Sequence, residues 1–270
     1  MAKEWVFDSP RTQAFTKARQ DFLSAFLAEL SKTVKLASAI DVGCALGDFS
    51  KFLSDRGMRV VGVDGRQENI DEAALRYPNI SFRRSDAEDL PIADLGRFDF
   101  TLCLGLLYHL ENPFRLIRGL SALTSEVAIL EGVCTPDSVP SMELLDEGVE
   151  VDQGLNYVAF YPSEPCLVKM LYCAGFPFVY RFRNLPNDEL YTASKWRKRP
   201  RTMLAASRHP LNMSNLVLAT EPIRPVHGEI DSWATPLRKL WVRTARIKNL
   251  LARPTENPAV TANTKQGTER

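Results

Sequence analysis

The sequence lacks several features that would assign it at once to a class of protein. Its formal net charge is only +1 over 270 residues, so the overall charge favours neither nucleic acid nor an anionic membrane as partner. The start, MAKEWVFDSP, lacks the basic and then apolar pattern of a signal peptide. No apolar run reaches the ~18 residues needed to span a bilayer. We therefore expect a cytoplasmic protein.

The cysteines argue against a disulfide framework and against a zinc site. There are five, an odd number, and no two form the Cys-x-x-Cys pair typical of zinc sites and redox dithiols. We expect reduced thiols and no bound metal. What the chain has is ordinary globular composition, 45% hydrophobic and 25% charged, with enough length for one large domain and appendages or for two small domains.

Alternating β-rich and helical segments predict the fold. Residues 12–30 place aromatic and leucine side chains on one helical face, so residues 1–35 are predicted to form an N-terminal cap helix. From residue 39, apolar β-rich runs alternate with predicted helices at 47–56, 67–76 and 112–123. This pattern is typical of an α/β, doubly wound, mostly parallel sheet of Rossmann-like type. We expect seven strands, within a domain that covers residues 36–221.

The rhythm changes after residue 132. Residues 133–162 are rich in proline, glycine and acidic residues, which predicts a lid or insert over the strand ends. A helix is expected from Ser163 to Gly175, followed by strands in FVYRFR and TMLAAS and one more short strand in NLVLAT. Residues 222–270 are predicted to hold a basic amphipathic helix and a tail that is disordered by composition.

A glycine turn follows the first predicted strand, in IDVGCALGDFS. Gly43 and Gly47 let a ligand approach the backbone closely, because no β-carbon intrudes, and the next helix start offers free N–H groups. A dinucleotide fingerprint, G-x-G-x-x-G, requires glycine where this chain has Ala45 and Asp48, and Asp48 repels a pyrophosphate. The turn therefore disfavours a phosphate ligand.

The alternative pattern, acidic-x-G-x-x-x-G, fits with Asp41, Gly43 and Gly47, and at this point the sequence resembles the class I S-adenosylmethionine-dependent methyltransferases. The resemblance implies that the amino-acid end and the ribose of S-adenosylmethionine lie over the turn. It implies that Asp41 faces the ammonium group, and that Cys44 belongs to the same cofactor-binding segment.

Two further acidic residues stand where that family has its next landmarks. Asp64 ends the second predicted strand, in VVGVDG, and the resemblance implies that its carboxylate accepts both ribose hydroxyls. Asp86, in RRSDAEDL, is implied to contact the adenine amine, with Ala87 behind the ring. A helix cap or a solvated loop position explains each carboxylate singly, whereas the order of all the landmarks favours the cofactor.

Tyr108 and His109 follow the fourth predicted strand, in LGLLYHLENP. Ligands of such sheets bind at the carboxyl ends of the strands, so Leu104 and Gly105 are expected beside the sulfonium. His109 is the candidate base for a hydroxyl acceptor, because imidazole titrates near neutrality, and Tyr108 is expected to orient the acceptor or the cofactor carboxylate. Alternatively, His109 caps the helix that begins near Asn112 and Tyr108 packs in the pocket wall.

Several blocks together resemble one subgroup, the tRNA wobble-uridine carboxymethyltransferase-like proteins. They are DVGC, LGLLYHLENP, NYVAFYPSEPCLVKMLYCAGF and RTMLAAS. The resemblance implies that Tyr108 and Arg201 hold the carboxylate of carboxy-S-adenosylmethionine. That compound is therefore the alternative to S-adenosylmethionine as cofactor.

Two basic segments leave the partner open. Residues 195–201, KWRKRPR, place a tryptophan among cations, which suits RNA phosphates with one stacked base or a solvated loop. Residues 235–253 form a basic amphipathic pattern, which suits peripheral contact with an anionic membrane or packing on the same domain or on a second subunit. The sequence makes no prediction of oligomeric state.

Taken together, these patterns predict methyl transfer to a hydroxyl or an amine of a small metabolite, natural product or glycan. Modification of tRNA and a non-catalytic methyltransferase-fold binding module are the alternatives.

Overall fold

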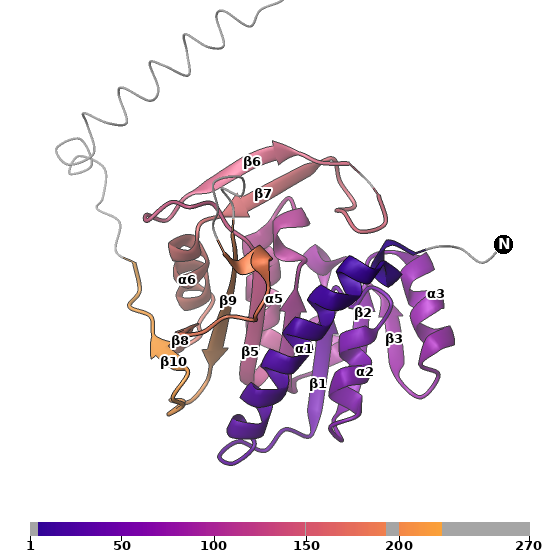
Figure 1. The fold of residues 1–270 in the computed structure, drawn as a ribbon, viewed down its shortest axis with the longest axis horizontal. Helices are drawn as coiled ribbons and strands as arrows, with labels where there is room; N and C mark the ends of the chain where they lie inside the picture. The colour runs from indigo at the N-terminus through magenta and orange to yellow at the C-terminus, as the bar shows by residue number, and fades with distance from the viewer. Residues whose placement is uncertain (1–4, 149, 193–199, 223–270) are drawn as a thin grey trace, which may run out of the picture. The chain divides into compact units, whose positions relative to one another are not determined.

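A central sheet forms from strands at nearly all the expected positions (Figure 1). In the part of the chain that the computed structural model describes (residues 5–148, 150–192 and 200–222) the sheet has eight strands. They are β1 (Ser38–Val42), β2 (Arg59–Asp64), β3 (Ser81–Arg84), β4 (Phe98–Leu104), β5 (Thr124–Val133), β8 (Phe178–Phe182), β9 (Arg201–Ser207) and β10 (Leu216–Leu218). The predicted α/β fold class is confirmed. The sheet has one strand more than seven, because the further short strand expected in NLVLAT forms as β10 and pairs with β8 at the edge.

The strand order places a crevice at the carboxyl end of β1. Across the sheet the order is β10-β8-β9-β5-β4-β1-β2-β3. The first five strands run parallel, whereas β9 runs antiparallel between β5 and β8. From β1 the chain proceeds to β2 and β3 on one side and later to β4 and β5 on the other. The loops after β1 and β4 therefore diverge, which is where ligands bind in open α/β sheets.

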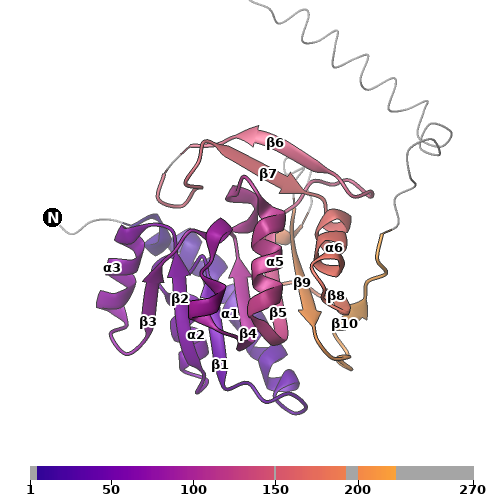
Figure 2. The same cartoon turned by 180° about the vertical axis from the view of Figure 1, so that it is seen from behind.

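Helices cover both faces of this sheet. On one face α1 (Pro10–Leu30) and α2 (Asp48–Ser54) pack against one half of the core, as Figure 1 shows. On the other, α5 (Pro113–Leu123) and α6 (Glu164–Cys173) pack against the second half (Figure 2). The remaining elements are α3 (Gln67–Arg76), α4 (Ile92–Leu95) and the 3₁₀ turns η1 (Val6–Asp8), η2 (Ala87–Asp89), η3 (Leu107–His109) and η4 (Glu189–Tyr191).

Helix α1 starts with a favourable cap and buries an apolar stripe. Ser9 precedes Pro10 and accepts a hydrogen bond from the Thr12 backbone N–H at 3.3 Å, which satisfies one of the free donors of the first turn. Its buried side chains include Phe15, Phe26 and, on the same face, Arg19. The helix therefore carries a cation into the protein interior.

A hairpin of β6 (Met142–Asp146) and β7 (Val158–Pro162) forms a second, two-stranded sheet within the segment predicted as a lid or insert. Figures 1 and 2 both show it across the carboxyl ends of the parallel strands. The side chains of β6 are mostly exposed, so the strand lacks the buried alternation by which a strand is recognised in a sequence.

Some predictions fall outside the described residues. These are the basic residues 195–199 and the predicted amphipathic helix and tail after residue 222, on which the proposed membrane contact depends. Within the described ranges, no helix combines the length and the apolar character needed to cross a membrane.

Candidate cofactor and acceptor site

A cavity of about 420 Å³ lies at the carboxyl ends of the parallel strands. This volume lies in the usual range for small-molecule sites, roughly 300–1,000 Å³. Most of the residues predicted for the site line it: Gly43, Cys44, Asp64, Asp86, Ala87, Leu104, Gly105, Tyr108, His109 and Arg201. Two predicted residues, Asp41 and Gly47, are not among the lining residues.

The turn after β1 is shaped by backbone conformation. Gly43 adopts φ +81°, and its N–H donates to the Val63 carbonyl at 2.8 Å. A Cβ at Gly43 would lie 3.0 Å from the Leu106 side chain, so this position requires glycine for both strain and space. Ala45 adopts φ +46°, a left-handed conformation that costs an L-residue roughly 1–2 kcal/mol.

Asp64 is held rigidly at the cavity wall. Its Oδ2 accepts from the Ala45 N–H at 3.0 Å, and its Oδ1 accepts from the Arg66 N–H at 2.9 Å and from Asn69 Nδ2 at 3.1 Å. The strained conformation of Ala45 thus aims a donor at the carboxylate. The end of β2 and the turn after β1 are locked together.

Asp86 both lines the cavity and caps a turn. Its Oδ1 accepts from the Glu88 N–H at 2.8 Å at the start of η2, and Ala87 follows it on the wall. Asp86 therefore caps the turn and lines the cavity at the same time. We call the Gly43–Ala45 turn, Asp64, Asp86 and Ala87 the cofactor end of the cavity.

Asp41 does not take the place expected of it. Its carboxyl is buried, accepts from Ser50 Oγ at 2.8 Å and lies off the cavity wall. Burial raises the pKa of Asp41 to about 7, an effect that the Ser50 hydrogen bond opposes. Gly47, also off the wall, adopts φ +88° where a Cβ would lie 2.8 Å from Phe82. Both residues thus lie where they shape the turn without lining the cavity.

A buried ion cluster adjoins the cavity, and two of its members, Arg19 and Arg201, line it. Glu131 of β5, fully buried, pairs with Arg201 of β9 and with Arg19 of α1, whose Nη1 lies 3.4 Å from Glu131 Oε2. Burial would raise the pKa of Glu131, but the guanidinium groups of Arg201 and Arg19 outweigh it and hold the pKa below its ordinary value. Two cations share one carboxylate, which leaves net positive charge.

Three hydrogen-bond donors converge over Gly105, the residue after β4. A Cβ on Gly105, at φ +75°, would lie 3.3 Å from Arg201 Nη2 and 3.9 Å from both Arg19 Nη1 and Tyr108 Oη. Arg201 Nη2 also donates to Tyr108 Oη at 3.1 Å. Arg19 Nε is buried and has no hydrogen-bond partner among the described residues. The absent side chain of Gly105 leaves room where these donors meet.

His109 contacts a residue of the hairpin instead of a helix. Its Nδ1 lies 2.6 Å from Glu147 Oε1, and no side-chain bond caps α5 at Asn112. Burial lowers the pKa of His109, and this effect outweighs the opposing influence of Glu147. The ring is therefore neutral at neutral pH. We call Arg19, Tyr108, His109, Glu131, Glu147 and Arg201 the acceptor end.

Comparisons with known proteins agree with this geometry. Residues 40–126 match the family described as "Methyltransferase domain". This segment, from β1 into β5, is thus similar to methyltransferase domains. The matched segment includes the whole cofactor end and also Tyr108 and His109, but stops before Glu131, Glu147 and Arg201. Most of the acceptor end therefore lies outside the part of the methyltransferase domain that the family defines.

Two curated relatives of the methyltransferase domain carry the name "Ubiquinone biosynthesis O-methyltransferase". The Coxiella burnetii protein (strain RSA 493) is 37% identical over 95 residues, 34% of this chain and 40% of that protein. The Xanthomonas campestris protein (strain 8004) is 28% identical over 125 residues, 44% of this chain and 50% of that protein. The chain thus matches half or less of the length of these relatives.

Solved structures resemble the methyltransferase domain in fold. The N-terminal domain of EvdMO1 with SAH bound has a TM-score of 0.59 at 22% identity, over 70% of this chain and 80% of that one. The magnesium protoporphyrin IX methyltransferase of Synechocystis PCC 6803 with bound SAM has a TM-score of 0.51 at 20% identity, over 77% and 87%. At these identities the likeness establishes the fold.

Three members of the acceptor end were not predicted from the sequence: Arg19, Glu131 and Glu147. Glu131 had a detectable signal, a carboxylate inside the apolar run EVAILEGV, because an ionisable residue in a buried strand needs a partner. Arg19 lies on the predicted buried face of α1. Glu147 had no such signal, because 38 residues separate it from His109.

Proposed function

We propose that this chain is an S-adenosylmethionine-dependent methyltransferase that acts on a hydroxyl group of a small acceptor. One observation carries the proposal: the cofactor end joins a left-handed glycine turn to a fixed carboxylate, Asp64, and Asp48 and Asp86 also line the cavity. Carboxylates accept hydrogen bonds from ribose hydroxyls and amines, and they repel a pyrophosphate. The site therefore fits a nucleoside cofactor without phosphate.

When bound, S-adenosylmethionine would supply the methyl group of its sulfonium to an acceptor oxygen, with S-adenosylhomocysteine as the leaving group. The chain's own contribution is to hold the acceptor, to exclude water and to remove a proton. Leu104 and Gly105 end β4 at the cavity, and Tyr108 and His109 follow them on its wall. His109 is neutral at neutral pH, because burial lowers its pKa, and so is able to act as the base.

The choice of a hydroxyl acceptor is supported by the relatives named as O-methyltransferases. An amine, a glycan hydroxyl or a natural product is equally compatible with the cavity. The proposed RNA contact depends on residues 195–199, outside the described ranges, and it remains a prediction, as does the cytoplasmic location.

Carboxymethyl transfer is a second candidate, favoured by the donors that converge over Gly105. Arg201 Nη2, Arg19 Nη1 and Tyr108 Oη surround this position, and their two guanidinium groups face one carboxylate, Glu131. Net positive charge suits a carboxylate ligand, such as the extra carboxylate of carboxy-S-adenosylmethionine. The same donors also suit the α-carboxylate of S-adenosylmethionine itself.

Isothermal titration calorimetry tests the proposal and separates the two candidates. We expect binding of S-adenosylmethionine and S-adenosylhomocysteine but not of NAD⁺. Asp64→Asn is expected to lower cofactor affinity about 10–100-fold, because hydrogen bonds to a charged group contribute about 1.5–3 kcal/mol. Asp94→Asn, a change at an exposed carboxylate off the cavity, is the matched control and is expected to change nothing.

Three outcomes would redirect the proposal. Tighter binding of carboxy-S-adenosylmethionine than of S-adenosylmethionine would favour carboxymethyl transfer. Binding of NAD⁺ with exclusion of S-adenosylhomocysteine would overturn the cofactor assignment. No binding of any of these compounds at millimolar concentration would favour the non-catalytic binding module.

A further inference from the structure

The hairpin of β6 and β7 delivers a carboxylate to His109. Glu147 directly follows β6, and its Oε1 lies 2.6 Å from His109 Nδ1. Its second oxygen, Oε2, accepts from the Gly154 backbone N–H at 3.0 Å. The two side chains are only 11% and 9% exposed. The hydrogen bond from Gly154 thus holds the carboxylate in place beside the ring.

This contact sets which ring nitrogen of His109 carries the hydrogen. A carboxylate only accepts hydrogen bonds, and a neutral imidazole donates from one nitrogen and accepts at the other. Nδ1 must therefore donate to Glu147. The ring also lines the cavity, so with Nδ1 donating to Glu147 the lone pair of the neutral ring belongs to Nε2.

We propose that Glu147 is the positioning residue of the reaction: it holds His109 as the Nδ1–H tautomer and stabilises the imidazolium that forms during turnover. This inference rests on the proposed function. His109 Nε2 takes the hydroxyl proton of the acceptor as the acceptor oxygen bonds to the methyl carbon and the S–C electron pair returns to sulfur. The positive charge that the ring gains then lies against the Glu147 carboxylate.

The surroundings of the ring shift the pKa of His109 in both directions. Burial lowers the pKa of His109, Glu147 raises it, Arg201 lowers it and Asp152 raises it. Glu147 is the group in direct contact with the ring, so removal of its charge is expected to lower the pKa further. A residue that only fills space would leave this pKa unchanged.

Nitrogen-15 NMR of the full chain tests the tautomer directly, without any acceptor. The sequence has three histidines, so His109→Gln assigns the signal of His109 in protein labelled at histidine. In the wild type with S-adenosylhomocysteine, two-bond and three-bond correlations are expected to show protonated Nδ1 and unprotonated Nε2 at pH 7. A wild-type ring protonated at Nε2 instead would overturn the proposal, whether or not any variant folds.

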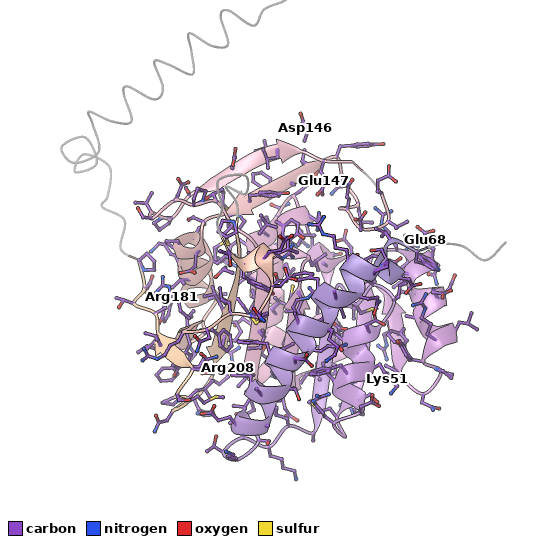
Figure 3. The ribbon with its side chains drawn as sticks, in the orientation of Figure 1. Lys51, Glu68, Asp146, Glu147, Arg181 and Arg208 are labelled. Atoms are coloured by element: carbon purple, nitrogen blue, oxygen red, sulfur yellow. The ribbon has the colours of Figure 1, made fainter. Side chains whose placement is uncertain are left out.

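Glu147→Gln supplies the second measurement. Its His109 pKa is expected to fall by about 1 or more, as for loss of an adjacent opposite charge, and Glu147→Asp is expected to restore part of the shift. Asp146→Asn is the matched control, because Asp146 adjoins Glu147 in the chain but is exposed (Figure 3). If Glu147→Gln folds and leaves the tautomer and pKa of His109 as in the wild type, Glu147 does not position the ring.

The two proposals fail in distinguishable ways. Failure of the wild type to bind S-adenosylhomocysteine would contradict the proposed function. The tautomer of His109 and its dependence on Glu147 are measured separately, from the nitrogen-15 signals of the ring. With cofactor bound, methyl transfer to a catechol probe is expected to fall at least tenfold in Glu147→Gln and to be unchanged in Asp146→Asn. Equal rates in the two variants, on a probe that the wild type methylates, would contradict the positioning role.

Discussion

Backbone groups form most of the hydrogen bonds at the cofactor end of the cavity, whereas charged and aromatic side chains form the acceptor end. The cofactor end follows three strands and lies within residues 43–87, and most of its hydrogen bonds run from main-chain N–H groups to Asp64 and Asp86. The acceptor end takes its side chains from distant segments: α1, β5, the hairpin and β9.

The two ends therefore differ in which substitutions they tolerate. Backbone conformation is set locally, so the cofactor end tolerates changes of most neighbouring side chains. The acceptor end depends on buried ion pairs between segments far apart in sequence. Loss of one partner leaves the other as a buried charge without a counter-charge. Substitutions at the acceptor end are therefore expected to have the larger effects.

The largest effect is expected at the buried ion cluster. Glu131→Gln leaves Arg19 and Arg201 without their carboxylate and is expected to lower the free energy of unfolding by about 3–5 kcal/mol, as measured by urea denaturation at pH 7. Asp89→Asn is the control: it breaks an ion pair with Arg115 whose side chains are 79% and 63% exposed, where less than about 1 kcal/mol is expected.

The contribution of this cluster to the free energy of unfolding depends on pH. The pKa of Glu131 is lowered in the folded state, so its stabilisation is fully present above its ordinary pKa and is lost as the pH falls through the folded pKa. The difference between wild type and Glu131→Gln should narrow in strong acid. Equal stability of the two proteins at pH 7 would show that the cluster does not hold the acceptor end together.

His109→Gln is expected to have the largest effect on chemistry. Loss of a general base lowers turnover about 10²–10⁴-fold, while affinity for S-adenosylhomocysteine stays within a few-fold because Asp64 and the glycine turn are untouched. Methyl transfer to a catechol probe and calorimetry measure the two quantities. His209→Gln, at an exposed histidine off the cavity, is the control. Unchanged turnover in His109→Gln would show that His109 is not the base.

Asp41 allows the cofactor end to be tested through pH. The pKa of Asp41 is raised to about 7 in the folded protein, so folding favours the protonated form and the wild type loses stability as the pH rises from the ordinary carboxyl pKa toward 7. Asn is neutral throughout. Between pH 5 and pH 8, Asp41→Asn should therefore gain about 2–3 kcal/mol relative to wild type.

Denaturation of both proteins at several pH values measures this relative gain. Asp94→Asn, at an exposed carboxylate, serves as control and should show no pH-dependent difference from wild type. A constant difference between Asp41→Asn and wild type over the whole range would mean that Asp41 is ionised in the folded protein.

The smallest effect is expected at Ala45. Ala45→Gly removes the strain of φ +46° and is expected to stabilise the protein by up to about 1 kcal/mol, after the greater freedom of glycine in the unfolded chain is counted. Ala25→Gly, at an exposed position inside α1, is expected to destabilise by roughly 0.5–1 kcal/mol. If both changes destabilise equally, the turn after β1 is not strained at Ala45.

Local elements could be predicted well because their signals are local. The helix at 67–76 has the predicted bounds. Strands β2 and β4 form in the apolar β-rich runs on which the predicted alternation rests, since continuous apolar runs mark parallel strands that are covered on both faces. The β6–β7 hairpin was not recognised as strands, because β6 is exposed. The placement of Asp41 was also not predictable, because a carboxylate at a strand end points either to the cavity or beneath it.

The amino-acid order alone determined the alternation of strands and helices, the glycine turn and the carboxylates at the strand ends, because these depend on neighbours in the chain. The pairing of Glu131 with Arg19 and Arg201, and the contact of Glu147 with His109, depend instead on the three-dimensional fold. Such pairs form where the fold brings distant segments together and excludes water, and nothing in the spacing of residues along a chain records that proximity.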